Sequence, residues 1–413
     1  MEGKFIAIAV AAVVVIAGVG IYFTMGNDGQ DRTPTGYIIW EAQYSVGLEK
    51  DYVGLALTND LFAGHTCCVI GASNSYASAN ANALAVFLKT YSQAVDRVNA
   101  ALADENSADY AKLIAVAKEK VAMPDGMSDA EKESAIKNAL KNVTYLYSDG
   151  ADGNLDKLKS DVASLAGSLT ESGVITKSAS DLGFVDSAAL ANKFVKDDYM
   201  KSAAAGSYTP LSSTTTIKVS AIKGDIHQIA VWFAKEQNMF SDAKLNIEIS
   251  QQSNGPAVYT QLENNEADIG LLGAPPMTIR SMNSGVDITN ALAADKGLSI
   301  IGRVNSEGSG ILLKPGEKAS DYITEQTDAP AEGAKFIKKG DKYYVFNVDK
   351  WKGKIFATPG TATIQHVQLG ELAKLMGLKY VSYVDGTELS DDSLYYIAGV
   401  SSFADFDNKV NGR

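Results

Sequence analysis

The sequence predicts an α/β fold, because strand-like and helix-like segments alternate through its second half. Segments 216–222 and 245–250 alternate apolar and polar residues in the strand period, and 267–273 and 353–357 are further short strand-like segments. Stretches of helical period lie between them. Such alternation is typical of a sheet with parallel strands and covering helices.

The first half of the chain is organised differently. Apolar runs at 36–40, 52–58 and 67–72 have the length and composition of strands. From Asn80 apolar residues recur at helical spacing, and helical patterns continue to about Lys196. We therefore expect three strands followed by a long helical region.

Two local signals add detail. Ser128 is followed three residues later by Glu131, which is the spacing of a capping box at a helix start. The charged, Gly-containing segment 315–348 predicts a surface insertion, with a hairpin at 342–346.

Length and charge exclude several classes of protein. The chain has 413 residues, which predicts two domains or three at most. It carries 49 acidic and 37 basic residues, a net charge of −12, and such a chain repels nucleic-acid backbones. Two adjacent cysteines and three histidines provide no multi-cysteine zinc site. The sequence therefore predicts no metal, no cofactor and no nucleic-acid partner.

The N-terminus predicts a membrane anchor. Residues 5–25 carry no charge, and a helix of that length spans roughly 31 Å, enough to cross a bilayer core. We expect a single-pass transmembrane anchor over 1–26, a linker over 27–35 and an extracytoplasmic soluble part. A cleaved signal peptide is the alternative, but its apolar core is usually shorter.

Several segments resemble the nitrate/sulfonate/taurine-type ABC transporter substrate-binding protein family. Residues 216–360 resemble the N-terminal half of that family and residues 36–103 resemble a later part. The segments that carry the resemblance are IKVSAIKGDIHQIAVWFAKEQNMF, NGPAVYTQLENNEADIGLLGAPP, VNSEGSGILLK, WKGKIFATPGTATIQ, GYIIWEAQYSVGLEKDY and GHTCCVIGASNSY. The helical region up to VDSAALANKFV is similar to the family's C-terminal tail.

The order of these segments is rotated relative to the family. The resemblance implies a two-lobed, periplasmic-binding-protein-like (type II) fold in circularly permuted form. The family's C-terminal half would occupy 36–205, with strands of one lobe, then a connector over 206–215, and the family's N-terminal half would occupy 216–413. Strands 36–40 and 353–357 should then share a sheet, with Thr35–Tyr37 close to Asn411–Arg413. The alternative is a family-like fragment beside an unrelated globule over 36–205.

Candidate ligand-binding residues follow the predicted strands, because α/β sheets bind ligands beyond the carboxyl ends of their strands. Helix starts there offer free N–H groups and a positive dipole end that suit an anion. The resemblance adds the last residue of strand 36–40 and the residue that follows it. These positions are Asp225 and His227, Ala274 and Pro275, Thr361 and Thr363, and Trp40 and Glu41. The threonines are also ordinary helix caps, and Trp40 also fits core packing.

The remaining histidines and the cysteines each fit more than one role. His65 and His366 lie beside the same predicted loops, and we include His65 among the ligand-binding candidates. Cys67 and Cys68 begin a strand, so their side chains should point to opposite faces. They fit small buried residues, although GHTCC is also similar to the Cys-rich strand of the fungal pyrimidine synthase for thiamine.

The functional expectation is a binding protein and not an enzyme. The chain contains none of the common nucleotide-binding, metalloprotease or nucleophile-elbow motifs. The resemblance implies an extracytoplasmic solute-binding protein at the cell membrane that delivers a small solute to the permease of an ABC importer. Nitrate, a sulfonate or a taurine-like anion would suit the helix starts. The alternative is a thiamine-pyrimidine precursor binding protein or an enzyme of that branch.

Overall fold

The computed structural model describes residues 32–147, 154–284 and 297–412. The predicted anchor at 1–26 lies outside these residues. Within the described ranges, no helix combines the length and the apolar character needed to cross a bilayer.

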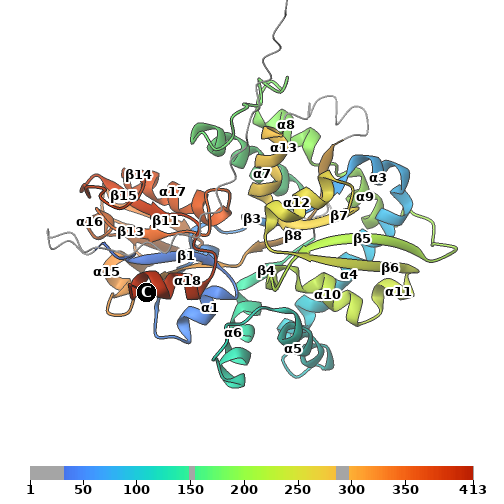
Figure 1. Ribbon diagram of the computed structural model, residues 1–413, viewed down its shortest axis with the longest axis horizontal. Helices are drawn as coiled ribbons and strands as arrows, with labels where there is room; N and C mark the ends of the chain where they lie inside the picture. Colours follow the sequence, from blue (N-terminus) through green and yellow to red (C-terminus); the bar gives the residue numbers. More distant parts are fainter. Residues whose placement is uncertain (1–31, 148–153, 285–296, 413) are drawn as a thin grey trace, which may run out of the picture.

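The described strands form two six-stranded mixed sheets, called A and B, and one three-stranded sheet, C (Figure 1). Sheet A lies on the left of Figure 1 and contains strands from both ends of the chain, while sheet B lies on the right. In order across sheet A the strands are β14 (Lys379–Ser382), β15 (Ser393–Ile397), β13 (Ile355–Ala357), β1 (Gly36–Trp40), β9 (Ser309–Leu313) and β2 (Val53–Leu57). In sheet B they are β4 (Val143–Tyr145), β8 (Leu298–Glu307), β3 (Thr66–Ser73), β7 (Ile269–Gly273), β5 (Thr215–Ile222) and β6 (Leu245–Gln252).

Five strands of each sheet follow one scheme. In sheet A, β15, β13 and β1 are parallel, β9 is antiparallel to β1, and β2 is antiparallel to β9. In sheet B, β6, β5 and β7 are parallel, β3 is antiparallel to β7, and β8 is antiparallel to β3. Along the chain, β9 of sheet A follows β8 of sheet B, and β3 of sheet B follows β2 of sheet A. In the scheme, β9 therefore corresponds to β3. The equivalent pairs are therefore β5 and β13, β6 and β15, β7 and β1, and β8 and β2.

Helices cover both sheets, and Figure 1 shows α12 and α13 above the strands of sheet B, with α10 and α11 below them. The helices of the first half are α1 (Gln43–Leu48), α2 (Thr58–Leu61), α3 (Asn74–Ala79), α4 (Ala81–Ala103), α5 (Ala108–Lys120), α6 (Asp129–Asn142), α7 (Asn154–Glu171), α8 (Ser187–Phe194) and α9 (Asp198–Ala204). The second half adds η1 (Ile226–Gln228), α10 (Ile229–Glu236), α11 (Met239–Asp242), α12 (Gly255–Glu263), α13 (Ala274–Asn283), α15 (Ala319–Tyr322), α16 (Val348–Trp351), α17 (Ile364–Met376) and α18 (Phe403–Val410).

The expected pairing of strands 36–40 and 353–357 is confirmed. β1 runs parallel to β13, with Gly36 opposite Phe356 and Tyr37 opposite Ala357. Helix α18 near the C-terminus packs on β1, because the rings of Tyr37 and Phe406 lie 4.7 Å apart. Figure 1 shows the C-terminal end beside β1 and α1, while Arg413 lies outside the described residues.

The alternative of a separate globule over 36–205 is wrong. That segment supplies β1 and β2 to sheet A but β3 and β4 to sheet B. The expectation that its strands belong to one lobe is corrected by the same finding. The physical reason is the crossing after β2, which carries the chain into the other sheet.

The local predictions have mixed outcomes. The capping box of α6 is confirmed, since Ser128 Oγ accepts from Glu131 N and Glu131 Oε2 accepts from Ser128 N. The predicted hairpin is also present, formed by β11 (Lys335–Lys339) and β12 (Lys342–Phe346) in sheet C, where β10 (Ile323–Gln326) is the third strand. The short edge strand β4 interrupts the predicted helical region, because it pairs with β8.

A rearranged chain tests this topology. We expect a protein that starts at Thr215, passes from Asn411 through a short flexible linker to Thr35 and ends at Ala205 to keep the fold. Termini that lie near each other on a surface tolerate such rearrangement, so the cost should be about 1–2 kcal/mol, or a few degrees in Tm. Circular dichroism and thermal unfolding measure both quantities.

The control is a chain cut between Val69 and Ile70. Both residues are fully buried in the middle of β3, so this cut should abolish cooperative unfolding. Equal behaviour of the two rearranged chains would contradict the closeness of Thr35 and Asn411 that the first rearrangement requires.

Candidate functional site

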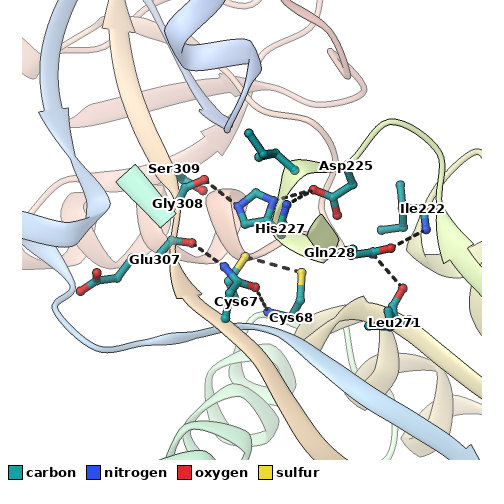
Figure 2. Close-up of polar contacts among 12 residues, drawn as sticks. Cys67, Cys68, Ile222, Asp225, His227, Gln228, Leu271, Glu307, Gly308 and Ser309 are labelled. Carbon is teal, nitrogen blue, oxygen red and sulfur yellow. Dashed lines mark hydrogen bonds and ion pairs between the residues drawn. The ribbon is translucent and has the colours of Figure 1, made fainter. Parts of the chain in front are cut away.

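The chain passes from sheet B to sheet A through one residue, Gly308. β8 ends at Glu307 and β9 begins at Ser309. The Gly308 carbonyl accepts two hydrogen bonds, from Glu41 N at 2.9 Å and from His227 Nε2 at 2.9 Å. Glu41 follows β1 in sheet A and His227 follows β5 in sheet B. One carbonyl therefore joins a loop of each sheet, and Figure 2 shows its contact with His227.

His227 is held by Asp225 on its other side. Asp225 caps η1, and its Oδ1 accepts from His227 N at 3.0 Å and lies 2.6 Å from His227 Nδ1. The His227 side chain is 2% exposed. Burial alone lowers the pKa of His227, but the Asp225 carboxylate, Cys67 and the Gly308 carbonyl raise it to about 10. The ring is therefore an imidazolium, which donates to a carboxylate and to a carbonyl.

The sequence has glycine at 308 because no other residue fits. Gly308 has a φ of +82°, a conformation that side chains strain. A Cβ atom there would lie 2.5 Å from His227 Nε2 and 2.8 Å from Val143 Cγ2. Glycine thus allows the imidazolium to approach the backbone of the crossing.

Glu41 is a buried carboxyl group beside this crossing. Its side chain is fully buried, Oε1 accepts from Asn142 Nδ2 at 2.7 Å, and Oε2 accepts from Ser45 N at 3.2 Å. Burial raises the pKa of Glu41, and these hydrogen bonds partly oppose the shift. Asn142 belongs to α6, so this contact connects the helical region to the end of β1.

The second crossing, from β2 to β3, touches the first. Thr58 Oγ1 donates to the Ser309 carbonyl at 3.1 Å, and Asn59 Nδ2 donates to the Asn142 carbonyl at 2.9 Å. Thr58 and Asn59 form the start of α2 within the second crossing. The two connections between the sheets are therefore hydrogen-bonded to each other at one place.

The loop after β13 also reaches this place. Thr363 caps α17, and Gln365 in its first turn donates from Nε2 to Ser309 Oγ at 2.8 Å. Thr361 is exposed, while Trp40 is half-buried at the end of β1. The candidates on these loops therefore come from neighbouring strands of sheet A.

Ala274 and Pro275 begin α13, after β7 of sheet B, and both are buried. Ala274 belongs to the same hydrophobic cluster as Ala42 and Ile364, which follow β1 and β13 of sheet A. The loops after β5, β1 and β13 therefore meet at Gly308 and Ser309, while the loop after β7 is placed only by its membership of this cluster. The strands that the four loops follow form the equivalent pairs β5 with β13 and β7 with β1.

His65 and His366 occupy separate surroundings. The Nδ1 atom of His65 lies 2.7 Å from the Phe62 carbonyl, and burial lowers the pKa of His65 to about 4. The Nδ1 atom of His366 lies 3.1 Å from the Tyr380 hydroxyl, and burial lowers its pKa to about 4 as well. Both rings are neutral at physiological pH, unlike His227.

The expected orientation of the cysteines is wrong. Cys67 Sγ and Cys68 Sγ lie 3.9 Å apart, instead of pointing to opposite faces (Figure 2). The register between β3 and β8 shifts between Thr66 and Cys68, as in a β-bulge. A bulge re-aims side chains, and here it brings the two thiols together.

Sequence reasoning missed the residues that link the loops. Asn59, Asn142, Gly308, Ser309 and Gln365 form no motif and lie far apart in the chain. A usable signal was Gly308, which lies between two strand-like segments where a glycine can mark a bulge or a close approach.

Comparisons with known proteins add no assignment. No family model, no curated protein and no solved structure matches this chain. Over the residues that the structure describes, no group of three or more His, Cys, Asp or Glu side chains is placed to hold a metal ion.

Replacing Gly308 by alanine tests the crossing. The Cβ clash with His227 adds to the strain of the positive φ, so we expect a loss of about 3 kcal/mol in the free energy of unfolding. The control is Gly316→Ala, where φ is +91° and a Cβ meets nothing within 4 Å. That change should cost only about 1 kcal/mol in urea unfolding. Equal losses would show that His227 does not constrain position 308.

The charge on His227 predicts a pH dependence. A pKa raised from about 6.5 to about 10 means that the folded state binds the proton more tightly than the unfolded state. The contribution to stability is therefore complete below about pH 6.5 and is lost as pH rises toward 10. Wild type and His227→Gln should differ by a few kcal/mol in urea unfolding at pH 6, and by much less at pH 10. A gap that stays constant with pH would argue against the imidazolium.

Proposed function

We propose that this chain is a circularly permuted, two-lobed periplasmic-binding-protein-like protein that captures a small anionic solute for an ABC importer. Sheet A and sheet B would each form the core of one lobe. The observation that carries the proposal is the common strand order of the two sheets, joined by two adjacent crossings. Two similar bodies connected at one place are suited to closing around a ligand by hinge motion.

The solute would sit where the four loops meet. Ligands of α/β sheets bind beyond the carboxyl ends of the strands, and here the loops after β5, β1 and β13 are hydrogen-bonded to the same crossing. The closed form around the solute would be the species that a permease recognises. Binding and closure suffice for this role, so no chemical step is assigned.

An anion is favoured by the start of α17. Its first-turn N–H groups and dipole suit nitrate, a sulfonate or a taurine-like sulfonate group. The start of α13 offers fewer donors, because Pro275 and Pro276 have no N–H. We therefore assign Thr361 and Thr363 to the anion, with Ala274 and Trp40 beside the rest of the solute.

His227, Asp225 and Glu41 receive a different role from the one the sequence suggested. Both ring nitrogens of His227 are used inside the protein, and the Glu41 carboxyl is fully buried. We propose that these three residues position the hinge and that their side chains do not contact the solute. Replacing these residues should lower the free energy of unfolding more than it changes the affinity for the solute.

The cellular setting follows from the same proposal. A binding protein of this type acts outside the cytoplasm, held at the membrane by the uncharged segment near its N-terminus. Its partners would be the solute and the permease of the importer.

Thermal unfolding with nitrate, ethanesulfonate, taurine and acetate tests the function. A solute at 100 times its Kd should add about 2.7 kcal/mol of stability. We expect at least one of these anions to raise Tm in a concentration-dependent way. A panel in which no anion changes Tm would contradict the anionic site.

Two matched cap variants locate the site. Thr363 and Ser402 each cap a helix through a side-chain oxygen, so Thr363→Ala and Ser402→Ala should each cost about 1 kcal/mol without ligand. Only Thr363→Ala should also reduce the stabilisation by the anion, because the proposed anion site is at the start of α17, which contacts the crossing through Gln365 and Ser309. Equal ligand stabilisation in both variants would remove the assignment to α17.

A further inference from the structure

The two cysteines form a close pair that the proposed function does not use. Cys67 and Cys68 are the only cysteines of the chain, and their Sγ atoms lie 3.9 Å apart. Both side chains are buried, at 4% and 5% exposure. The register pairs Thr66 with Ser306 and Cys68 with Asn305, which leaves Cys67 as the extra residue of the bulge. The backbone itself therefore holds the two thiols together.

The surroundings distinguish the two sulfur atoms. The hydrogen bond with Cys68 lowers the pKa of Cys67 although burial opposes this, and the charge of His227 lowers it further. The same hydrogen bond and burial raise the pKa of Cys68. Figure 2 shows both cysteines below the His227 ring, with Cys68 to the right of Cys67. A thiolate is the reactive form of cysteine, so Cys67 is the nucleophile of the pair.

We propose that Cys67 and Cys68 are a redox-active dithiol, which hydrogen peroxide oxidises to a disulfide between the two adjacent residues. The Cys67 thiolate attacks one peroxide oxygen, the O–O bond breaks, and Cys67 becomes a sulfenic acid while hydroxide takes up a proton to form water. The Cys68 thiol then attacks the Cys67 sulfur, the S–S bond forms, and a second water leaves. Two thiols and one peroxide thus give one disulfide and two waters, and the two electrons pass from sulfur to oxygen.

The geometry selects the oxidant and makes the step reversible. Because both thiols are nearly inaccessible, a small peroxide reaches them more readily than a protein disulfide does. The Cα atoms of adjacent residues lie about 3.8 Å apart, closer than in an ordinary disulfide, so the bond is strained and easily reduced. This inference is independent of the solute-binding role.

The test uses the reduced full-length protein with hydrogen peroxide and intact-mass measurement. Wild type should lose two hydrogen atoms and both free thiols, and dithiothreitol should restore them. Cys68→Ser removes the resolving thiol, so its Cys67 should stop at a sulfenic acid that dimedone traps. Cys67→Ser should react at least about tenfold more slowly. The double variant Cys67→Ser, Cys68→Ser is the control and should show no thiol oxidation.

Several outcomes would overturn the proposal. One is wild type that accumulates sulfinic acid with no loss of two hydrogens. Another is a disulfide-linked dimer on a non-reducing gel in place of the internal bond. A third is a Cys67→Ser variant that reacts as fast as Cys68→Ser. The wild-type result needs no substitution, so the proposal stays testable if a variant does not fold.

Discussion

The structure depends on the carbonyl of Gly308, which accepts one hydrogen bond from a loop of sheet A and one from a loop of sheet B. The donor from sheet B is a buried imidazolium, and a buried charge is tolerated only when it is paired and hydrogen-bonded. Asp225 provides the pairing and Gly308 provides the second acceptor. Each member therefore needs the others: without Asp225 the charge is unpaired, and with a side chain at 308 the ring cannot approach. A buried polar network of this kind stabilises and rigidifies the structure most when every polar group in it has a hydrogen-bond partner.

The same place explains why neither sheet is complete alone. Strand β9 of sheet A directly follows β8 of sheet B in the chain, and β3 of sheet B follows β2 of sheet A after the short helix α2. Each antiparallel strand lies between two strands of its new sheet, so its removal would separate β2 or β8 from the rest. A circular rearrangement of the kind proposed would change where the chain begins but would leave these two exchanges intact. Rearrangement is tolerable because it cuts a connection outside both exchanged strands.

Sequence patterns predicted the parts of this fold that depend on local periodicity. The strands at 36–40, 245–250 and 267–273 and the capping box at Ser128 were predictable, since each depends on residues close in sequence. The candidate loops were predictable too, because they follow strand ends. The contacts of Gly308 with His227 and of Asn142 with Glu41 were not, since they join residues 81 and 101 positions apart. The cysteines were misjudged because a bulge, which has no clear sequence signal, reverses the alternation of a strand.

The distribution of contacts around the crossing also indicates which of them an opening motion would break. Helix α7 packs on the sheet B side and meets α17 through Ser168 with Glu371 and through Lys374 with Glu171. Lys374 and Glu171 are 70% and 76% exposed, and such surface ion pairs contribute about 0–1 kcal/mol. The contacts of His227 and Glu41 at the crossing are buried and costly to separate. Under the proposed function, opening would therefore release the weak surface contacts between α7 and α17 first. The buried carbonyl of Gly308 would remain the pivot, with the anion-binding start of α17 moving away from α13.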